Sequence, residues 1–370
     1  MRLLALLSLG CSVTPAPQTE TPSVEPTDEL PDERSVTFYG VTGFADGQVQ
    51  YVDEAVSYRL ATPLFSDYAI KQRAVIFPEG EAARYDGDGI LDFPVGTVIL
   101  KSFLFPADFR QPDQDVRVIE TRVLVREDDG WETWPYLWND EMSDAKRSPS
   151  GAVVDIDFID AEGNPVSTAY LVPQRNQCVD CHEVLIGEDR ANVPIGPRPR
   201  NLAVDGQWEQ WVADGLVTDL PSEPVVPAVD AQAWPSTPPS EWDDAYLDAA
   251  TRDYLDVNCA HCHNPNGTEG VSSQLFLNWD NEDQFRLGVC KKPGSAGRGT
   301  GGLIYDIVPG EPESSILWYR TQTEEVGEMM PDIGRSLRDD RAIELIEAWI
   351  ARLPGDCEEP EESTTTPSTP

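Results

Sequence analysis

The chain has 370 residues, enough for two ordinary domains and their linkers, and its hydrophobic fraction of 40 % is sufficient for packed cores. Acidic residues outnumber basic ones 66 to 27, which gives a formal net charge of −39. Since a phosphate backbone needs a basic face on its partner, this charge excludes nucleic acid as a natural partner. The charge suits protein partners that present basic patches, although selection for solubility alone would give the same composition.

The N-terminal segment predicts export. Residues 1–10 carry one basic residue and then a short apolar run, which is typical of a lipoprotein-type signal peptide. Cys11 follows Gly10 as in a lipobox, so a lipid on Cys11 would anchor the chain to a membrane. Residues 11–34 are rich in Pro, Thr, Ser and Glu and are expected to form a disordered tether. An ordinary signal peptide or a misassigned start codon is the alternative, and no later segment is apolar enough to span a membrane.

Residues 35–200 are predicted to form an antiparallel β domain. The clearest strands cover residues 97–105, 116–126 and 152–159, and turn signals lie at 86–89, 129–130 and 162–164. In the second of these strands, one face carries Ile119, Thr121, Val123 and Val125, and the other carries Glu120, Arg122 and Arg126. The last predicted strand runs almost directly into Cys178.

Two copies of the pattern Cys-x-x-Cys-His follow, and this pattern is the attachment signature of c-type haem. The thiols add to the haem vinyl groups, and the histidine becomes the proximal iron ligand. Zinc would require four ligands at each site, and a chain with three histidines has too few for both sites. We therefore expect two covalent haems, with two zinc knuckles or two disulfides as the alternative. The attachment residues are Cys178, Cys181 and His182 in the first copy and Cys259, Cys262 and His263 in the second.

Residues 201–240 are rich in proline and are predicted to be a linker, although Trp208 and Trp211 suit a short helix. Residues 241–357 are predicted to form a helical domain, and residues 358–370 a disordered tail. Apolar residues at helical spacing predict one helix that delivers Cys259 and another near the end of the domain: Leu247, Ala250, Tyr254 and Val257, then Ile343, Ile346, Ile350 and Leu353. Cys290 and Cys357 either form a disulfide or remain free.

Residues 242–354 resemble a class I cytochrome c domain. The resemblance is carried by residues 254–265 around the second motif, by residues 308–317, by Met329, Met330 and Pro331, and by the helix that contains Trp349. It implies an all-α fold in which His263 is the proximal ligand and Met330 the distal one, with Met329 as the second candidate. A thioether ligand favours ferrous iron and raises the potential, as suits electron transfer.

Residues 57–353 resemble a bacterial family of diheme c-type cytochromes of unsettled role, whose first half is rich in β-structure. The matching stretches are residues 62–68, 134–140, 176–182, 195–197 with 200–201, and 288–291. Residues 93–101, followed by a terminal haem motif, are more weakly similar to cytochrome c-prime-beta and its lysine-cross-linked relatives. That similarity implies an open iron position and makes Lys101 the lysine of interest, although a lysine on an alternating strand is normally solvated.

The leading interpretation is an exported cytochrome of the periplasm or cell envelope that carries electrons between redox partners. It assigns no catalytic residue and leaves the oligomeric state open. Because no Met-Pro loop follows His182, we expect the first iron to lack a strong sixth protein ligand; Met142 is the alternative. His261 is expected to face solvent, or else to ligate the other haem. One competing function is a haem enzyme, peroxidase-like or acting on small nitrogen compounds, in which the second haem supplies electrons to a reactive first haem. Another is a surface interaction module in which the haems are structural.

Overall fold

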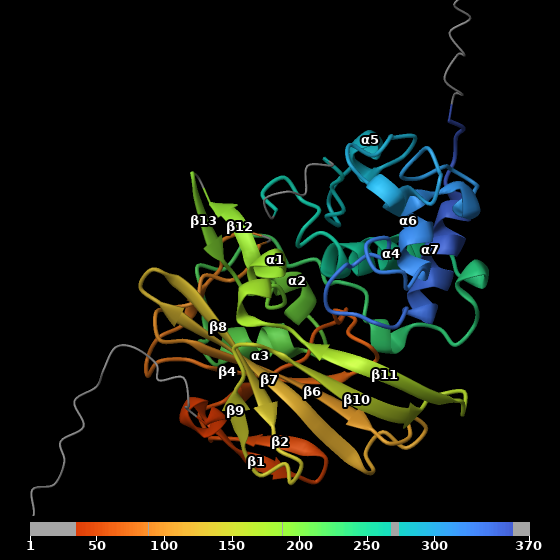
Figure 1. Cartoon of the computed structure of the whole chain (residues 1–370). Helices are drawn as coiled ribbons and strands as arrows, with labels where there is room; N and C mark the ends of the chain where they lie inside the picture. The colour runs from red at the N-terminus through yellow and green to blue at the C-terminus, as the bar shows by residue number, and fades with distance from the viewer. Residues whose placement is uncertain (1–34, 88, 187, 268–273, 358–370) are drawn as a thin grey trace, which may run out of the picture. The chain divides into compact units, whose positions relative to one another are not determined.

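The computed structural model describes residues 35–357 except 88, 187 and 268–273. The predicted signal segment, the tether with Cys11 and the tail beyond residue 357 lie outside the described residues. The described chain is a mixed α and β structure built on a six-stranded antiparallel sheet with the strand order β3-β4-β6-β7-β8-β9 (Figure 1). These strands are β3 (Val56–Ser57), β4 (Ile70–Ile76), β6 (Val98–Pro106), β7 (Val116–Glu127), β8 (Gly130–Trp138) and β9 (Ala145–Arg147).

Three smaller hairpins and one short parallel pair accompany this sheet. The hairpins are β1 (Val41–Ala45) with β2 (Gln48–Tyr51), β10 (Ala152–Ile159) with β11 (Pro165–Val172), and β12 (Glu183–Ile186) with β13 (Asp189–Asn192). The parallel pair is β5 (Ala83–Arg84) with β14 (Val217–Thr218). The strands predicted at 97–105, 116–126 and 152–159 are confirmed as β6, β7 and β10; β6 and β7 are largely buried, whereas β10 alternates between buried or half-buried and exposed residues.

Two apolar clusters cover opposite ends of one face of the large sheet. At one end, Phe103 and Phe105 of β6 pack against Ile156, Phe158 and Tyr170 of the β10–β11 hairpin. At the other end, Val75, Ile99 and Leu124 pack with Leu202, Trp208 and Trp211. The sheet face between these two clusters lies beside the chain segment that carries the first cysteine motif.

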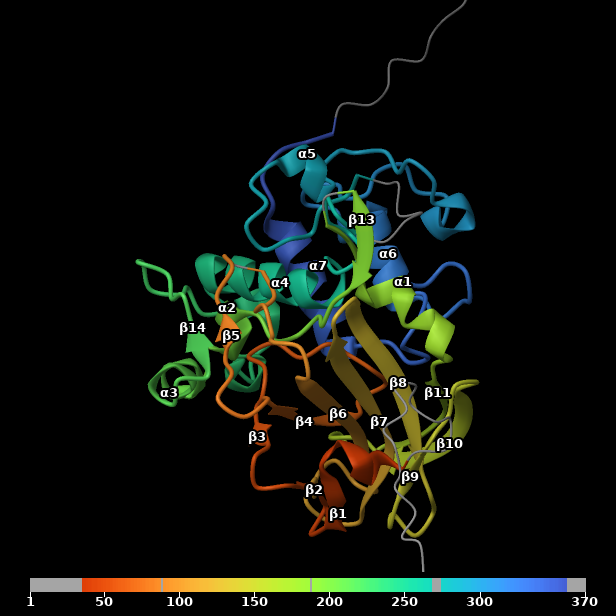
Figure 2. The same cartoon turned by 90° about the vertical axis from the view of Figure 1, so that its left-hand side faces the viewer.

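The segment predicted as a linker is only partly a connector. It contains the end of α2 (Pro199–Leu202), all of α3 (Gln207–Ala213) and β14, which lies beside β5 (Figure 2). Trp208 and Trp211 are three residues apart, so both indoles lie on one side of α3 and are buried in the apolar cluster on the sheet. The proline-rich part that follows contains two short 3-10 turns and no longer element.

The remaining helices are α1 (Val179–His182), α4 (Asp244–Asn258), α5 (Gln284–Leu287), α6 (Ile316–Gln322) and α7 (Asp340–Arg352). Asp243 caps α4 by accepting from the amides of Ala245 and Tyr246, and Asp339 caps α7 by accepting from the amide of Ala342. The two long helices share a core that includes Leu247, Leu255, Leu345, Ile346 and Trp349. Both predicted helices are therefore confirmed, and Cys290 and Cys357 form a disulfide.

The β-rich and helical parts are joined by direct contacts. The amide of Phe65 donates to Asn258 Oδ1 at 2.7 Å, and the amides of Ser336 and Leu337 both donate to Asp67 Oδ1. Arg200 of α2 forms a buried ion pair with Asp253 of α4. The chain from Glu33 onward accordingly clusters as one unit. Within the described residues, no helix is both long enough and apolar enough to cross a bilayer.

Candidate functional site

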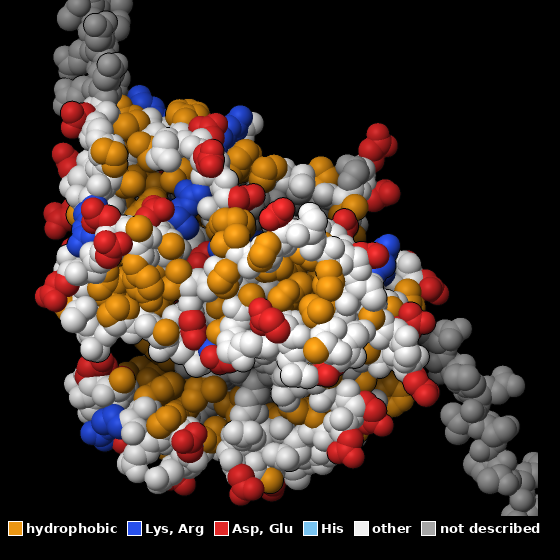
Figure 3. All heavy atoms as spheres, turned by 180° about the vertical axis from the view of Figure 1, so that it is seen from behind, with side chains coloured by type: hydrophobic (Ala, Val, Ile, Leu, Met, Phe, Trp, Pro, Cys, Tyr) orange, Lys and Arg blue, Asp and Glu red, His pale blue; other side chains and the backbone are white. Residues whose placement is uncertain are grey.

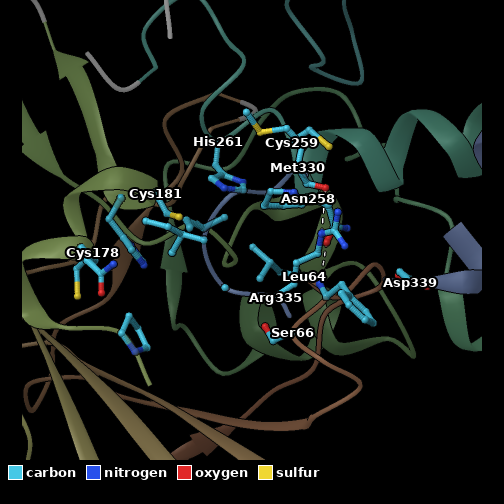
Figure 4. A pocket seen from close by; sticks show the side chains of 18 of the residues that line it. Leu64, Ser66, Cys178, Cys181, Asn258, Cys259, His261, Met330, Arg335 and Asp339 are labelled. Carbon is cyan, nitrogen blue, oxygen red and sulfur yellow. Dashed lines mark hydrogen bonds between the residues drawn. The ribbon is translucent and has the colours of Figure 1, made fainter. Parts of the chain in front are cut away.

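Residues of both cysteine motifs border one cavity. From the first motif it is lined by Cys178, Cys181 and His182, and from the second by Cys259 and His261. Met330 lines the same cavity, with Asn258 and Arg335 beside it (Figure 4). Three segments that are far apart in the sequence therefore meet here, and they carry most of the residues that the sequence singles out.

The loops that carry the two cysteine motifs, residues 178–182 and 259–263, touch each other. Cys262 Sγ donates to the carbonyl oxygen of Asp180, 82 positions earlier in the chain, at 3.1 Å. The Sγ atoms of Cys181 and Cys262 and a ring nitrogen of His261 all lie within 4.8 Å of one another. Whatever the two motifs hold is therefore held in close proximity.

His182 ends α1 with its ring oriented by the backbone. Its Nδ1 lies 2.7 Å from the carbonyl oxygen of Val193, so Nδ1 carries the proton and Nε2 is left for a metal. Burial lowers the pKa of His182 to about 4, which keeps the imidazole neutral at pH 7. A neutral imidazole whose other nitrogen donates to a carbonyl is the usual form of an axial ligand.

His263 is also neutral. Burial lowers its pKa to about 4, and the positive charges of Arg320 and Lys291 and the neighbouring His261 act in the same direction. Its carbonyl oxygen accepts from the amide of Leu277 at 2.9 Å, which fixes the chain directly after the motif. His263 and Cys262 are not among the residues that line the cavity shared by the two motifs.

The expectation that His261 faces solvent is wrong. Its side chain is 7 % exposed and lines the cavity beside Cys181 (Figure 4). The motif spacing places this residue on the outer side of its own loop, but the first motif packs against that side and covers it. The ring is held by the carbonyl oxygen of Val257, which lies 3.3 Å from Nδ1.

Met330 is half buried and is positioned by an arginine. The Met330 amide donates to the carbonyl oxygen of Arg320 at 2.8 Å, and Arg335 Nε donates to the Met330 carbonyl oxygen at 3.1 Å. The guanidinium of Arg335 also donates to the carbonyl oxygens of Arg320, Thr323 and Leu337. Met329 is buried and is not among the cavity residues, so the structure favours Met330 as the sulfur available to a bound group.

The sheet contributes Lys101, Arg122 and Thr133 to the cavity wall. Lys101 is thus half buried in the site instead of solvated. Arg122 and Glu120 were predicted on the polar face of their strand, and that face is buried here; strand alternation alone does not reveal which polar face becomes covered.

Met142 lies in the turn after β8, beyond Trp138, and about 17 Å of extended strand separates Trp138 from Thr133. Met142 is therefore far from His182.

The four thiols differ in their surroundings. Burial raises the pKa of Cys178, and it raises that of Cys259 to about 12. Hydrogen bonds from Cys262 and His261 lower the pKa of Cys181. The neutral imidazoles and paired thiols of the two motifs are donors of the kind that a covalently attached haem requires, and Met330 adds a thioether to the cavity, whereas Cys262 and His263 do not line it. No protein-family model, curated protein or solved structure matches this chain, so its function has to be argued from these residues and their geometry.

Proposed function

We propose that the chain is an exported diheme c-type cytochrome that carries electrons between redox partners. The observation that carries this proposal is that residues of both Cys-x-x-Cys-His motifs line one cavity. Two haem-attachment motifs that meet at one cavity provide a path through the protein, because electron transfer rates fall steeply with distance.

Each residue has a distinct part in this function. Haem supplies an iron that alternates between its ferrous and ferric states. Cys178 and Cys181 would hold one group and Cys259 and Cys262 the other through thioether bonds, with His182 and His263 as neutral proximal ligands. The Met330 thioether would close the sixth position of the second site and favour the reduced state, while Arg335 keeps the backbone of Met330 in place. A closed position excludes substrate and suits transfer.

The same proposal includes the fold class of the C-terminal part of the chain. The β-rich part, which ends in the first motif, is followed by a region whose long helices α4 and α7 share a core, with Met330 on the loop before α7. This order of motif helix, methionine loop and final helix is the one that the resemblance to class I cytochrome c implies. We assign residues 241–357 to that class on this basis.

The cell envelope is the proposed location. The Cys290–Cys357 disulfide suits an oxidising compartment, and acidic side chains are spread over the molecular face shown in Figure 3, where basic ones are few. Redox partners with basic patches would associate with such a surface. Replacing Cys11 with serine should move the protein from the membrane fraction to the soluble fraction, because a lipid on Cys11 is the proposed anchor. Equal partition of Cys11→Ser and wild type would leave an ordinary signal peptide.

A haem count tests the main proposal. The pyridine haemochrome assay on the exported protein should give two c-type haems per chain. The pair Cys178→Ser and Cys181→Ser should leave one haem, and the pair Cys259→Ser and Cys262→Ser should also leave one. A wild-type count of zero would refute the proposal.

A metal centre is the second candidate, because Cys181, His261 and Cys262 already bring three ligand atoms within 4.8 Å. Zinc in structural sites usually takes four such ligands. This candidate requires stoichiometric zinc in the haem-free protein and the loss of that zinc in His261→Ala. A protein with two haems per chain and no zinc excludes it.

A further inference from the structure

Four basic residues lie together on one face of the large sheet; we call them the cationic strip (Lys71, Arg73, Lys101 and Arg122). Lys101 of β6 is paired directly with Arg73 of β4 and with Arg122 of β7. Lys71 lies two residues from Arg73 on the same strand. Directly paired residues, and residues two apart on a strand, project from the same face of an antiparallel sheet. All four side chains therefore belong to one face.

The strip interrupts an otherwise apolar surface. On one side of it, Val75, Ile99 and Leu124 belong to the cluster around α3, and on the other side Phe105 belongs to the cluster under β10 and β11. Three of the cations surround the buried ring of Phe103: the Arg122 guanidinium carbon lies 4.3 Å, Lys101 Nζ 4.9 Å and Lys71 Nζ 6.0 Å from the ring centre. Basic residues in the middle of a covered face are costly unless something compensates their charge.

In the part of the chain that the structure describes, Glu120 is the one carboxylate that lies within ion-pair distance of a cation of this strip. Glu120 accepts from Arg122 at 2.7 and 3.0 Å and also accepts from the Tyr170 hydroxyl at 2.6 Å, so its oxygens are engaged. Among the described residues, no ion pair includes Lys71, Arg73 or Lys101, in a chain whose net charge is −39. Arg73 is 7 % exposed, and its Nη2 has no hydrogen-bond partner there. Against the effect of burial, Asp339 and Asp67 act to raise the pKa of Lys71 from beyond ion-pair distance. Within the described residues, Arg73 and Lys101 are therefore the cations of the strip without a carboxylate of their own.

The strip reaches the cavity of the first motif. Lys101 and Arg122 line that cavity together with Cys178, Cys181 and His182. Burial and the other cations lower the pKa of Lys101 well below its usual range, and burial lowers that of Lys71 to about 7. Asp339 and Asp67 partly offset the effect on Lys71, whereas the carboxylate that acts on Lys101 is Glu120, which already pairs with Arg122.

We propose that the cationic strip is an anion-binding site at the first motif, with Lys101 as its principal contact. The ligand class is a carboxylate or a small inorganic oxyanion, for which ammonium and guanidinium groups are the natural donors. This chemistry has two sources: a carboxylate of the haem held by Cys178 and Cys181, which rests on the proposed function, and a free anion that enters the cavity. If the ligand is a free anion, the strip gives the first site a binding property that a plain electron carrier does not need.

The test uses Lys101→Met and Lys71→Met in the full-length protein. The matched control is Lys146→Met, because Lys146 lies on β9, away from the strip, and its side chain is 69 % exposed and pairs with Asp144. Two properties are measured after the haem count: the midpoint potential of the first haem and the affinity for sodium sulfate by calorimetry, since sulfate is an oxyanion that does not ligate haem iron. Lys101→Arg, which retains the charge, shows whether charge or shape is responsible.

If a haem carboxylate is the ligand, Lys101→Met lowers the potential and leaves sulfate affinity unchanged, because a lost positive charge disfavours the added electron. If a free anion is the ligand, Lys101→Met weakens sulfate binding by about tenfold or more, as expected for the loss of a charged hydrogen bond. Wild-type values of both properties in Lys101→Met and Lys71→Met overturn the proposal. A chain without haem refutes the proposed function alone. The sulfate titration of that chain still decides on the strip: binding that Lys101→Met weakens supports it, and no such binding refutes it.

Discussion

At the scale of single residues, Arg335 determines how the Met330 loop is held. Its guanidinium donates to four carbonyl oxygens, those of Met330, Arg320, Thr323 and Leu337. Backbone carbonyls in a loop without regular structure need such donors, because a buried polar group without a partner is costly. One buried side chain thus replaces the hydrogen bonds that a helix or sheet would supply.

Replacing Met330 with alanine should abolish the sulfur-to-iron charge-transfer band and lower the potential of the second haem, because the thioether stabilises ferrous iron. Visible and near-infrared spectra of the oxidised protein and a redox titration measure both effects. Met329→Ala is the control, since Met329 is buried and does not line the cavity. A band that survives in Met330→Ala and is lost in Met329→Ala would show that Met329 is the ligand.

Replacing Arg335 with methionine should weaken the same band and lower the free energy of unfolding by about 3 kcal/mol or more, since a hydrogen bond to a charged group contributes about 1.5–3 kcal/mol. Urea denaturation gives the stability and the spectrum gives the ligation. The control is Arg338→Met in the same loop, whose side chain is 51 % exposed. An unchanged band in Arg335→Met would show that the arginine does not position Met330.

The two Cys-x-x-Cys-His motifs were recognisable from sequence because haem attachment requires a fixed spacing. Their role in attachment stays a prediction. His261, Lys101 and Arg122 were not recognisable as site residues, because their roles depend on which segments pack together. The burial of His261 results from contact with a loop some 80 positions away, and local periodicity carries no information about that contact. A local pattern identifies the chemistry of a residue and leaves its neighbours undetermined.

At the scale of elements, α4 and α7 were predictable because both have an aspartate cap and apolar residues at helical spacing. Within residues 201–240, the short helix predicted at Trp208 and Trp211 is confirmed as α3, but the proline-rich composition gave no sign that both indoles are buried against the sheet. Composition describes a segment as a whole, whereas burial is decided by a few large side chains.

The junction between α2 and α4 offers a test at this scale. Asp253→Asn would leave the buried Arg200 without its carboxylate, and breaking a buried pair in this way costs about 3–5 kcal/mol. Chemical denaturation should show this loss. Asp244→Asn on the same helix is the control: Asp244 is largely exposed where it pairs with Arg352, so its loss should cost about 1 kcal/mol or less. Equal losses in the two variants would contradict the assignment.

At the scale of the whole molecule, the two haem sites are expected to behave differently. Carbon monoxide should bind about one haem per reduced chain, because Met330 is, of the described residues, the one methionine that lines the cavity and a single thioether can close one iron; on the proposed function that iron belongs to the second haem. Spectral titration measures the stoichiometry, and Met142→Ala should not change it. If carbon monoxide binds neither haem until His261 is replaced by alanine, His261 is the sixth ligand of the first haem, and the interpretation as a haem enzyme is then excluded.

The contact between the attachment loops also has a consequence for biogenesis. Covalent attachment requires that an assembly enzyme reach each thiol, but in the folded chain Cys181 and Cys262 face each other and His261 across less than 5 Å. On the proposed function, the haems would have to be attached while residues near Asp180 and residues near Cys262 are still apart. Closure of this contact would then be a late step of maturation, and a chain that folds before it is loaded would bury its own attachment sites.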